Sequence, residues 1–229
     1  MNIIVTGASS GIGFELVKIF CQSQHRVLAI ARNEEKLNHL QSCCAEDSLI
    51  PVVCDITQPD NPKLKTAITS LSGSIDVVIN NAGLLINKPF MTLNDEDWQQ
   101  TFEVNVFGVV RFLQFLHPFL NRRNAHIVNI GSMGGFMGSS KFSGLSAYSA
   151  AKGALAILTE CLAEEWKLDN IRVNCLALGA VQTDMLSAAF PNYQAPLKAD
   201  EMAEWIAYFA LNGYRFFNGK ILPVSLDTP

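Results

Sequence analysis

Metal-ligand motifs are missing from this chain of 229 residues. Six cysteines occur, but none forms a CxxC pair, and none of the four histidines stands near them at metal-ligand spacing. We therefore expect no metal site. A chain of this size does not depend on disulfides, and a free cysteine in an apolar segment behaves as a small hydrophobic residue. We interpret the cysteines as reduced thiols of a cytoplasmic protein: Cys21, Cys43, Cys44, Cys54, Cys161 and Cys175.

Runs of one charge and long apolar runs are also missing. Lys and Arg number 17 and Asp and Glu 21, so that the net charge is −4, and the two signs are mixed along the chain. This distribution suggests no nucleic-acid groove and no basic patch for a membrane surface. The longest apolar stretch, 104–120, is too short and too interrupted to span a membrane. Residues 1–5 lack a basic start and a cleavage site, so they predict a strand and not a signal peptide.

Short apolar runs alternate with longer segments of helical period. The runs are continuously apolar, which is typical of parallel strands covered on both faces, and the alternation indicates βαβ units. The predicted fold class is therefore α/β: a single Rossmann-like domain over 1–229, with a doubly wound parallel sheet of about seven strands and helices on both faces. The predicted strands are 2–6, 26–31, 49–54, 75–80, 125–131, 171–177 and 220–224. The predicted helices are 11–23, 33–44, 62–71, 94–121, 147–167 and 199–211.

A glycine-rich turn, TGASSGIG, joins the first predicted strand to the first predicted helix. Gly7, Gly11 and Gly13 permit close approach of the backbone to a ligand, and the free N–H groups of a helix start attract a pyrophosphate. A turn without a ligand is the ordinary alternative. The segment also satisfies GxSxG, the nucleophile elbow of α/β-hydrolases. We reject the hydrolase because only six residues precede Gly7 and no histidine follows His126.

The end of the second predicted strand favours NADP(H) over NAD(H). An acidic residue there would bind the adenosine ribose of NAD and repel a 2′-phosphate. Arg32 stands there instead, directly after Ala31, and a guanidinium matches a phosphate in charge and geometry. An ordinary surface arginine at a strand end is the alternative.

Tyr148 and Lys152 stand four residues apart at the start of a predicted helix, so both side chains share one helix face. A phenol has a pKa of about 10, and a nearby ammonium lowers that pKa. The pair is therefore expected to exchange a proton with a substrate oxygen while hydride moves at the adjacent carbon. The spacing alone is a weak motif, because many solvent-exposed helices carry it.

Five further motifs follow in order along the chain. They are Asp55 after the third predicted strand, Asn80-Asn81-Ala82-Gly83 after the fourth, Asn105 in a predicted helix, Ser132 after the fifth strand and Thr183 after the sixth. Each alone has an ordinary explanation, such as a helix cap or a strand end. Together with Tyr148 and Lys152 they resemble the motifs of the classical short-chain dehydrogenase/reductase family, and the match covers nearly the whole chain.

The resemblance implies an NADP-dependent oxidoreductase that moves hydride between a nicotinamide and a carbonyl or secondary alcohol, with Tyr148 as general acid or base. It implies that Ser132 binds the substrate oxygen, that Asn105 supports a water in a proton relay and that Thr183 holds the nicotinamide amide. The implied catalytic residues are Asn105, Ser132, Tyr148 and Lys152. The implied cofactor-binding residues are Gly7, Ser9, Ser10, Gly11, Ile12, Gly13, Arg32, Asp55, Ile56, Asn81, Ala82, Gly83, Tyr148, Lys152, Gly179, Val181 and Thr183.

Three segments depart from the family pattern. Leu178 stands where a proline usually precedes Gly179. Residues 133–147 are longer than usual by about three, and residues 184–198, the usual substrate-covering region, are short. The pocket candidates are apolar, although most are equally suited to the core. They are Leu84, Leu85, Met133, Phe136, Phe142, Leu178, Met185 and Phe190.

Two predicted helical stretches, 104–116 and 155–163, are unusually apolar and need cover beyond their sheet side. In similar proteins these helices form a dimer interface, so a homodimer or homotetramer is expected besides the small-molecule carbonyl or alcohol substrate. A non-catalytic sensor or scaffold that binds NADP is the alternative function. The intact Ser132, Tyr148 and Lys152 speak against it, because a sensor needs no acid or base.

Overall fold

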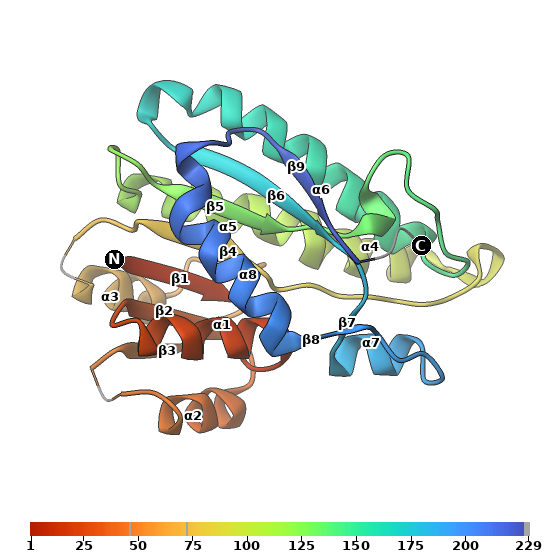
Figure 1. Ribbon diagram of the computed structural model, residues 1–229, viewed down its shortest axis with the longest axis horizontal. Coiled ribbons are helices and arrows are strands. Elements are labelled where there is room, and N and C mark those ends of the chain that lie inside the picture. Colours follow the sequence, from red (N-terminus) through yellow and green to blue (C-terminus); the bar gives the residue numbers. More distant parts are fainter. Residues whose placement is uncertain (46, 72, 227–229) are drawn as a thin grey trace.

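The computed structural model describes residues 1–45, 47–71 and 73–226. Across these residues, seven parallel strands form one sheet in the order β3-β2-β1-β4-β5-β6-β9 (Figure 1). The predicted α/β fold class is confirmed, and each predicted strand end lies within two residues of the observed one. The strands are β1 Asn2–Thr6, β2 Arg26–Ala31, β3 Leu49–Val53, β4 Val77–Asn80, β5 His126–Ile130, β6 Arg172–Leu178 and β9 Ile221–Val224.

Helices cover both faces of the sheet (Figure 1). Ile3 and Val5 pack with α1, α2 and α8, whereas Ile4 packs with α3, α5 and α6 on the other face. Successive strand residues point to opposite faces of the sheet, so a strand with helices on both faces is apolar throughout. The continuous apolar runs in the sequence predict this arrangement. The helices are α1 Gly11–Gln22, α2 Glu34–Ser42, α3 Pro62–Ser70, α4 Asp95–Phe102, α5 Gly108–Leu116, α6 Ser146–Glu165, α7 Asp184–Ala189 and α8 Ala199–Asn212.

The strand order reverses beside β1. Chain order runs outward from β1 to β2 and β3 on one side, and then returns to β4 on the other. In open α/β sheets such a reversal leaves a crevice at the carboxyl ends of the strands. The glycine turn follows β1 and Asn81 follows β4, so both motifs lie at that crevice.

The predicted single helix 94–121 is wrong in detail. The structure has α4, a π-helical turn η2 Glu103–Phe107, α5 and a 3₁₀ turn η3 His117–Phe119 that contains Pro118. At the π turn, the Gly108 N–H donates to the Glu103 carbonyl, five residues earlier. Asn105 occupies this turn, and its side-chain Nδ2 donates to the Thr101 carbonyl at 2.8 Å. A side chain inserted into the helical ladder is a recognised cause of such a break.

The segment after β6 contains short elements that the sequence did not predict. Two short strands, β7 Val181–Gln182 and β8 Leu197–Lys198, pair in parallel, and α7 lies between them in the chain. Thr183 caps α7 by accepting a hydrogen bond from the Leu186 N–H. The remaining 3₁₀ turns are η1 Phe90–Thr92, η4 Met133–Gly135, η5 Lys167–Asp169 and η6 Gly213–Arg215. Among the described helices, none combines the length and the hydropathy that crossing a membrane requires.

Candidate active site

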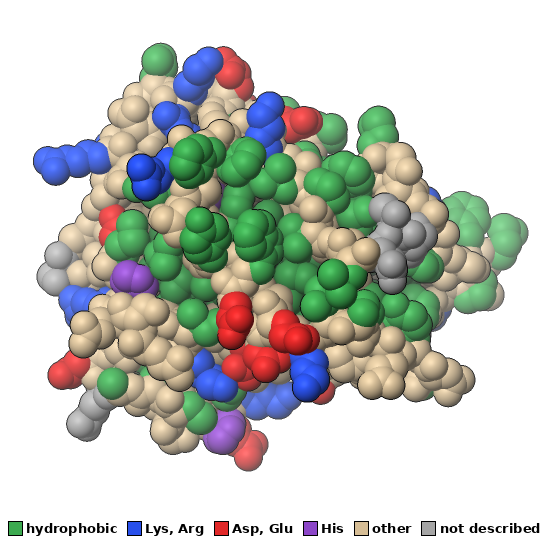
Figure 2. Space-filling model, in the orientation of Figure 1, with side chains coloured by type: hydrophobic (Ala, Val, Ile, Leu, Met, Phe, Trp, Pro, Cys, Tyr) green, Lys and Arg blue, Asp and Glu red, His purple; other side chains and the backbone are tan. Residues whose placement is uncertain are grey.

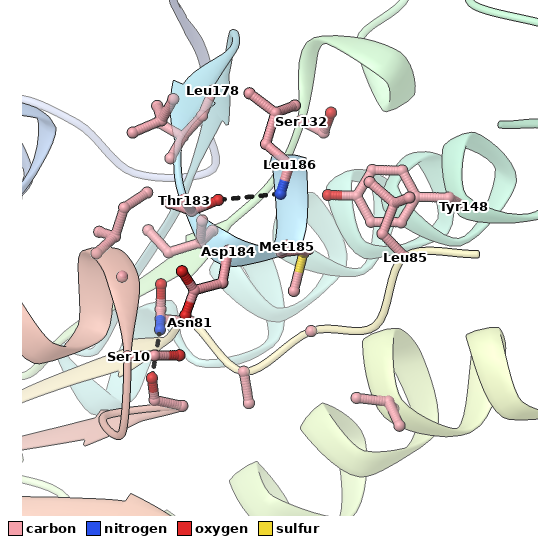
Figure 3. A pocket seen from close by; sticks show the side chains of 18 of the residues that line it. Ser10, Asn81, Leu85, Ser132, Tyr148, Leu178, Thr183, Asp184, Met185 and Leu186 are labelled. Atoms are coloured by element: carbon pink, nitrogen blue, oxygen red, sulfur yellow. Dashed lines mark hydrogen bonds between the residues drawn. The ribbon is translucent and has the colours of Figure 1, made fainter. Parts of the chain in front are cut away.

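A cavity of about 690 Å³ opens at the carboxyl ends of the strands, a size within the range of small-molecule and cofactor sites. Almost every predicted site residue lines this cavity. Figure 3 shows Ser10, Asn81, Ser132, Tyr148 and Thr183 among them. Gly13 and Asn105 are the exceptions: both are buried and neither lines the cavity. The predicted residues that line the cavity are Gly7, Ser9, Ser10, Gly11, Ile12, Arg32, Asp55, Ile56, Asn81, Ala82, Gly83, Ser132, Tyr148, Lys152, Gly179, Val181 and Thr183.

The glycine turn is held against the end of β4. Gly7 and Gly11 have φ angles of +66° and +55°, a conformation that side chains other than that of glycine rarely adopt. The Asn81 Nδ2 donates to the Gly7 carbonyl at 3.2 Å, and the Thr6 hydroxyl accepts the Asn81 N–H at 3.0 Å. A Cβ on Gly13 would collide with the Gly7 carbonyl, so Gly13 serves the close packing of α1 on this turn.

The start of α1 has unused hydrogen-bond donors. Ser10 is the N-cap residue, but its side chain makes no capping hydrogen bond, and the first turn of α1 contains no acidic residue. The first N–H groups of a helix have no partner within the helix, and they carry the positive end of its dipole. Ser10, Gly11 and Ile12, at the start of α1, line the cavity, which gives this end of it an affinity for anions.

Arg32 and Asp55 lie at the far end of the cavity, after β2 and β3. The Arg32 side chain is 75% exposed, and its Nη1 lies 3.9 Å from the Asp55 Oδ2. Because the pair is long and exposed, it holds the guanidinium only weakly. Asp55 also accepts hydrogen bonds from the Thr57 N–H and hydroxyl, at 2.9 and 2.8 Å, which fixes the turn after β3.

Tyr148 and Lys152 lie together on one face of α6, as their spacing predicts. The Lys152 Nζ is 5.7 Å from the centre of the Tyr148 ring and donates to the Ile130 carbonyl at 2.7 Å. Lys152 is only 4% exposed, so its ammonium is shielded from solvent. Figure 3 shows the Tyr148 hydroxyl directed into the cavity, with Ser132 on the neighbouring segment.

Burial changes the acidity of both side chains. It raises the pKa of Tyr148 to about 12, although a hydrogen bond with Ser132 acts in the opposite direction. It lowers the pKa of Lys152 to about 8, partly opposed by the nearby Cys175. The sequence-based expectation of a lowered Tyr148 pKa is therefore wrong for the chain without a ligand. The cost of desolvating a phenolate outweighs the opposing effect of the Ser132 hydroxyl.

Asn105 is fully buried, and its side chain is already satisfied by protein groups. Its Nδ2 donates to the Leu84 and Thr101 carbonyls at 2.7 and 2.8 Å, and its Oδ1 accepts the Leu84 N–H at 3.3 Å. Asn105 thus fastens the loop after β4 to the π turn. A Cβ on Gly83 would stand 3.1 Å from the Asn105 Oδ1 and 3.7 Å from the Lys152 Nζ, which places this junction beside the buried ammonium.

A polar ladder beneath the site was missed by sequence reasoning. The Asn80 Nδ2 donates to the Asn129 Oδ1 at 2.7 Å, and the Asn129 Nδ2 donates to the Thr159 hydroxyl at 2.8 Å. These buried bonds join β4, β5 and α6; Asn81 follows β4, Ser132 follows β5, and Tyr148 lies in α6. The available signal was an asparagine inside each of two otherwise apolar strands, since buried amides need partners.

The opposite end of the cavity is apolar. Six of the eight predicted pocket residues line it, whereas Leu84 and Phe136 do not. Among the further lining residues that sequence reasoning missed are four large hydrophobic side chains from turns, loops and a short helix, whose direction periodicity does not reveal. The confirmed lining residues are Leu85, Met133, Phe142, Leu178, Met185 and Phe190, and the additional ones are Val104, Leu145, Leu186 and Tyr193.

Comparison with known proteins gives a consistent result. The profile of the family described as short chain dehydrogenase matches residues 1–194. An uncharacterised oxidoreductase of Staphylococcus saprophyticus is 33% identical, covering 90% of this chain and 88% of the relative, and one of Staphylococcus epidermidis is 29% identical with the same coverage.

Solved structures also match. A short-chain dehydrogenase/reductase from Brucella melitensis, described as glucose/ribitol dehydrogenase, has a TM-score of 0.87 at 25% identity, covering 98% of this chain and 94% of that one. A 3-ketoacyl-(acyl-carrier-protein) reductase from Brucella melitensis, solved with NADH, has a TM-score of 0.88 at 24% identity, covering 98% and 96%. At that identity the second likeness supports the fold alone.

Proposed function

The chain belongs to the short-chain dehydrogenase family and is an oxidoreductase of that type, and from this premise we propose that it transfers hydride between NADP(H) and a carbonyl or secondary alcohol. The observation that carries the proposal is the arrangement around Tyr148. Its hydroxyl faces the cavity, Ser132 lines the same cavity, and the buried ammonium of Lys152 lies 5.7 Å from the centre of its ring.

The cavity fits a dinucleotide. The uncapped start of α1 and the left-handed Gly7 and Gly11 provide N–H groups and open backbone for a pyrophosphate. Arg32 is free to meet a 2′-phosphate at one end, and Tyr148 and Lys152 lie at the other. When bound, the nicotinamide supplies or accepts the hydride.

The chain's own residues would handle the proton. With a pKa near 12, Tyr148 keeps its proton at neutral pH and can donate it to a carbonyl oxygen as that oxygen gains negative charge. The ammonium of Lys152 and the hydroxyl of Ser132 stabilise the charge that is left on the tyrosine and on the substrate oxygen. In the oxidation direction the phenolate form of Tyr148 accepts the alcohol proton, and Lys152 and Ser132 stabilise that anion before the transfer.

We propose an apolar carbonyl compound as substrate, because the wall beyond Tyr148 consists of aliphatic and aromatic side chains. We also propose a homodimer or homotetramer. Five residues of α5 and seven of α6 are buried within one chain, whereas Phe107, just before α5, and Ile157, in α6, remain about half exposed. Figure 2 shows a further collection of hydrophobic side chains over α8 and β9, where Trp205, Tyr208 and Phe216 are exposed. The cytoplasmic location stays a prediction.

The test is an activity assay with a panel of uncharged ketones and aldehydes, in which turnover is measured as the loss of NADPH absorbance. We expect reduction with NADPH, and slower reduction with NADH. NADPH binding in a titration without turnover of any compound in the panel would instead support a non-catalytic NADP-binding protein.

A further inference from the structure

Three segments surround the apolar end of the cavity. The loop after β4, residues 81–89, contributes Leu85. The loop between β5 and α6 contributes Met133 and Phe142, and the segment 184–198 contributes Phe190 and Tyr193. The shape of this end therefore depends on how the three segments are held relative to one another.

The loop after β4 is the anchored segment. At its start, the Asn105 side chain holds both backbone groups of Leu84. At its end, the Lys88 Nζ contacts both carboxylate oxygens of Asp97 at 2.8 and 2.7 Å. Asp97 is itself fixed, because it forms a capping box with Asn94 at the start of α4. The residues between these two anchors are thus a firm base for the other two segments.

Asn87 lies in this base and contacts both of the other segments. Its Nδ2 donates to the carbonyl of Ala189, the last residue of α7, at 2.8 Å. Its Oδ1 lies against Gly144, where an added Cβ would collide with it. The adjacent Lys88 N–H donates to the Gly144 carbonyl at 3.0 Å. Gly144 also has a φ of +86°, so both its backbone conformation and its lack of a side chain permit the contact.

We propose that Asn87 is a positioning residue that holds the α7 segment and the 133–145 loop together around the substrate. Its contacts with Ala189 and Gly144 fix the wall that carries Phe142 and Phe190. The inference rests on the proposed function for its kinetic consequence, but its structural consequence is measurable without substrate.

The first experiment is Asn87→Ala, with Asn87→Asp as a second variant that keeps the size but replaces the donor with a carboxylate. We expect the KM for the carbonyl substrate to rise about three- to tenfold, as the loss of one hydrogen bond implies, while kcat and the KM for NADPH stay near their original values. We also expect faster chymotryptic cleavage after Tyr193, which is half exposed in this segment.

The chain offers a matched control in the same loop. Gly138 has a φ of +84°, like Gly144, but no atom lies within 4 Å of where its Cβ would be. Gly138→Ala therefore introduces the backbone strain alone, whereas Gly144→Ala also displaces Asn87. We expect Gly144→Ala to reproduce the KM and the cleavage rate of Asn87→Ala, and Gly138→Ala to leave both unchanged. In the double variant Asn87→Ala/Gly144→Ala the effects on KM should not add.

The outcomes separate the two proposals. If Asn87→Ala changes neither the cleavage after Tyr193 nor the KM, or if it accelerates cleavage with KM unchanged, Asn87 does not position the substrate wall. If no carbonyl compound is reduced by the parent protein, the proposed function fails. In that case the cleavage rate still tests whether Asn87 holds the two segments together. Unchanged cleavage in Asn87→Ala would overturn this structural role as well, whereas accelerated cleavage would support the structural role without the kinetic one.

Discussion

Tyr148 and Lys152 show how one buried environment acts on two different acids. Desolvation disfavours the charged form of each, so it raises the pKa of the phenol and lowers that of the ammonium. Near pH 7 the result is a protonated tyrosine beside a lysine that is still mostly charged. This state suits the donation of a proton to a carbonyl, as the proposed reduction requires.

Replacing Tyr148 with phenylalanine tests the proton donor. The ring and its packing against α6 remain, but the hydroxyl that faces the cavity is lost. We expect kcat to fall about 10²- to 10⁴-fold, the usual contribution of a positioned acid, with little change in the affinity for NADPH. Steady-state kinetics and a fluorescence titration with NADPH measure the two quantities. Unchanged turnover would show that another group supplies the proton.

Arg32→Ala tests the cofactor preference. Because one charge-assisted contact with a 2′-phosphate would be lost, we expect kcat/KM for NADPH to fall about 10- to 100-fold, while the value for NADH changes little. Arg123→Ala is the matched control, since Arg123 is exposed but precedes β5 at the opposite end of the sheet. An equal fall with both cofactors would mean that Arg32 does not read the phosphate.

At the scale of whole elements, the sequence predicted those strands and helices whose formation depends on local residue patterns. The seven strands could be predicted because continuous apolar runs suffice to define strands buried on both faces. The π turn could not, because it depends on bonds from Asn105 to Thr101 and Leu84. Likewise α7 is too short for a periodic signal. The motif residues around the cavity could be named, but the tie at Asn87 joins residues more than one hundred positions apart.

Two glycines on facing elements test the packing of α6 on η4. Gly153 lies inside α6, and an added Cβ would meet only the Gly135 carbonyl at 3.6 Å, an ordinary contact. We therefore expect Gly153→Ala to stabilise the fold by about 0.5–1 kcal/mol through helix propensity, raising Tm by about 1–4 °C. A Cβ on Gly135 would stand 2.5 Å from the Lys152 backbone carbon, so Gly135→Ala should lower Tm. Calorimetry measures whether Tm rises or falls in each variant. A lowered Tm for Gly153→Ala would contradict the described packing.

At the scale of the whole molecule, His126 joins elements that lie far apart in the chain. It is fully buried at the start of β5, with Nδ1 at 2.9 Å from the Ala210 carbonyl and Nε2 at 3.0 Å from the Asn174 Nδ2. The Asn174 side chain also accepts the Lys220 N–H and donates to the Phe217 carbonyl. A neutral ring satisfies this network, donating to Ala210 and accepting from Asn174. A protonated ring would face the Asn174 amide with a second donor.

The stability of the molecule is therefore expected to depend on pH through His126. Burial lowers the pKa of His126 from its usual 6.5 to about 4, so between these values the unfolded chain binds a proton that the folded chain excludes. The free energy of unfolding should then fall as the pH falls, by about 2 kcal/mol from about pH 7 to about pH 5, before most carboxylates titrate. Urea unfolding at the two pH values measures it. The pKa of His25 is also lowered by burial, so His25→Gln is the control that should keep most of the dependence. His126→Phe should remove most of it, and an unchanged dependence in that variant would place its origin elsewhere.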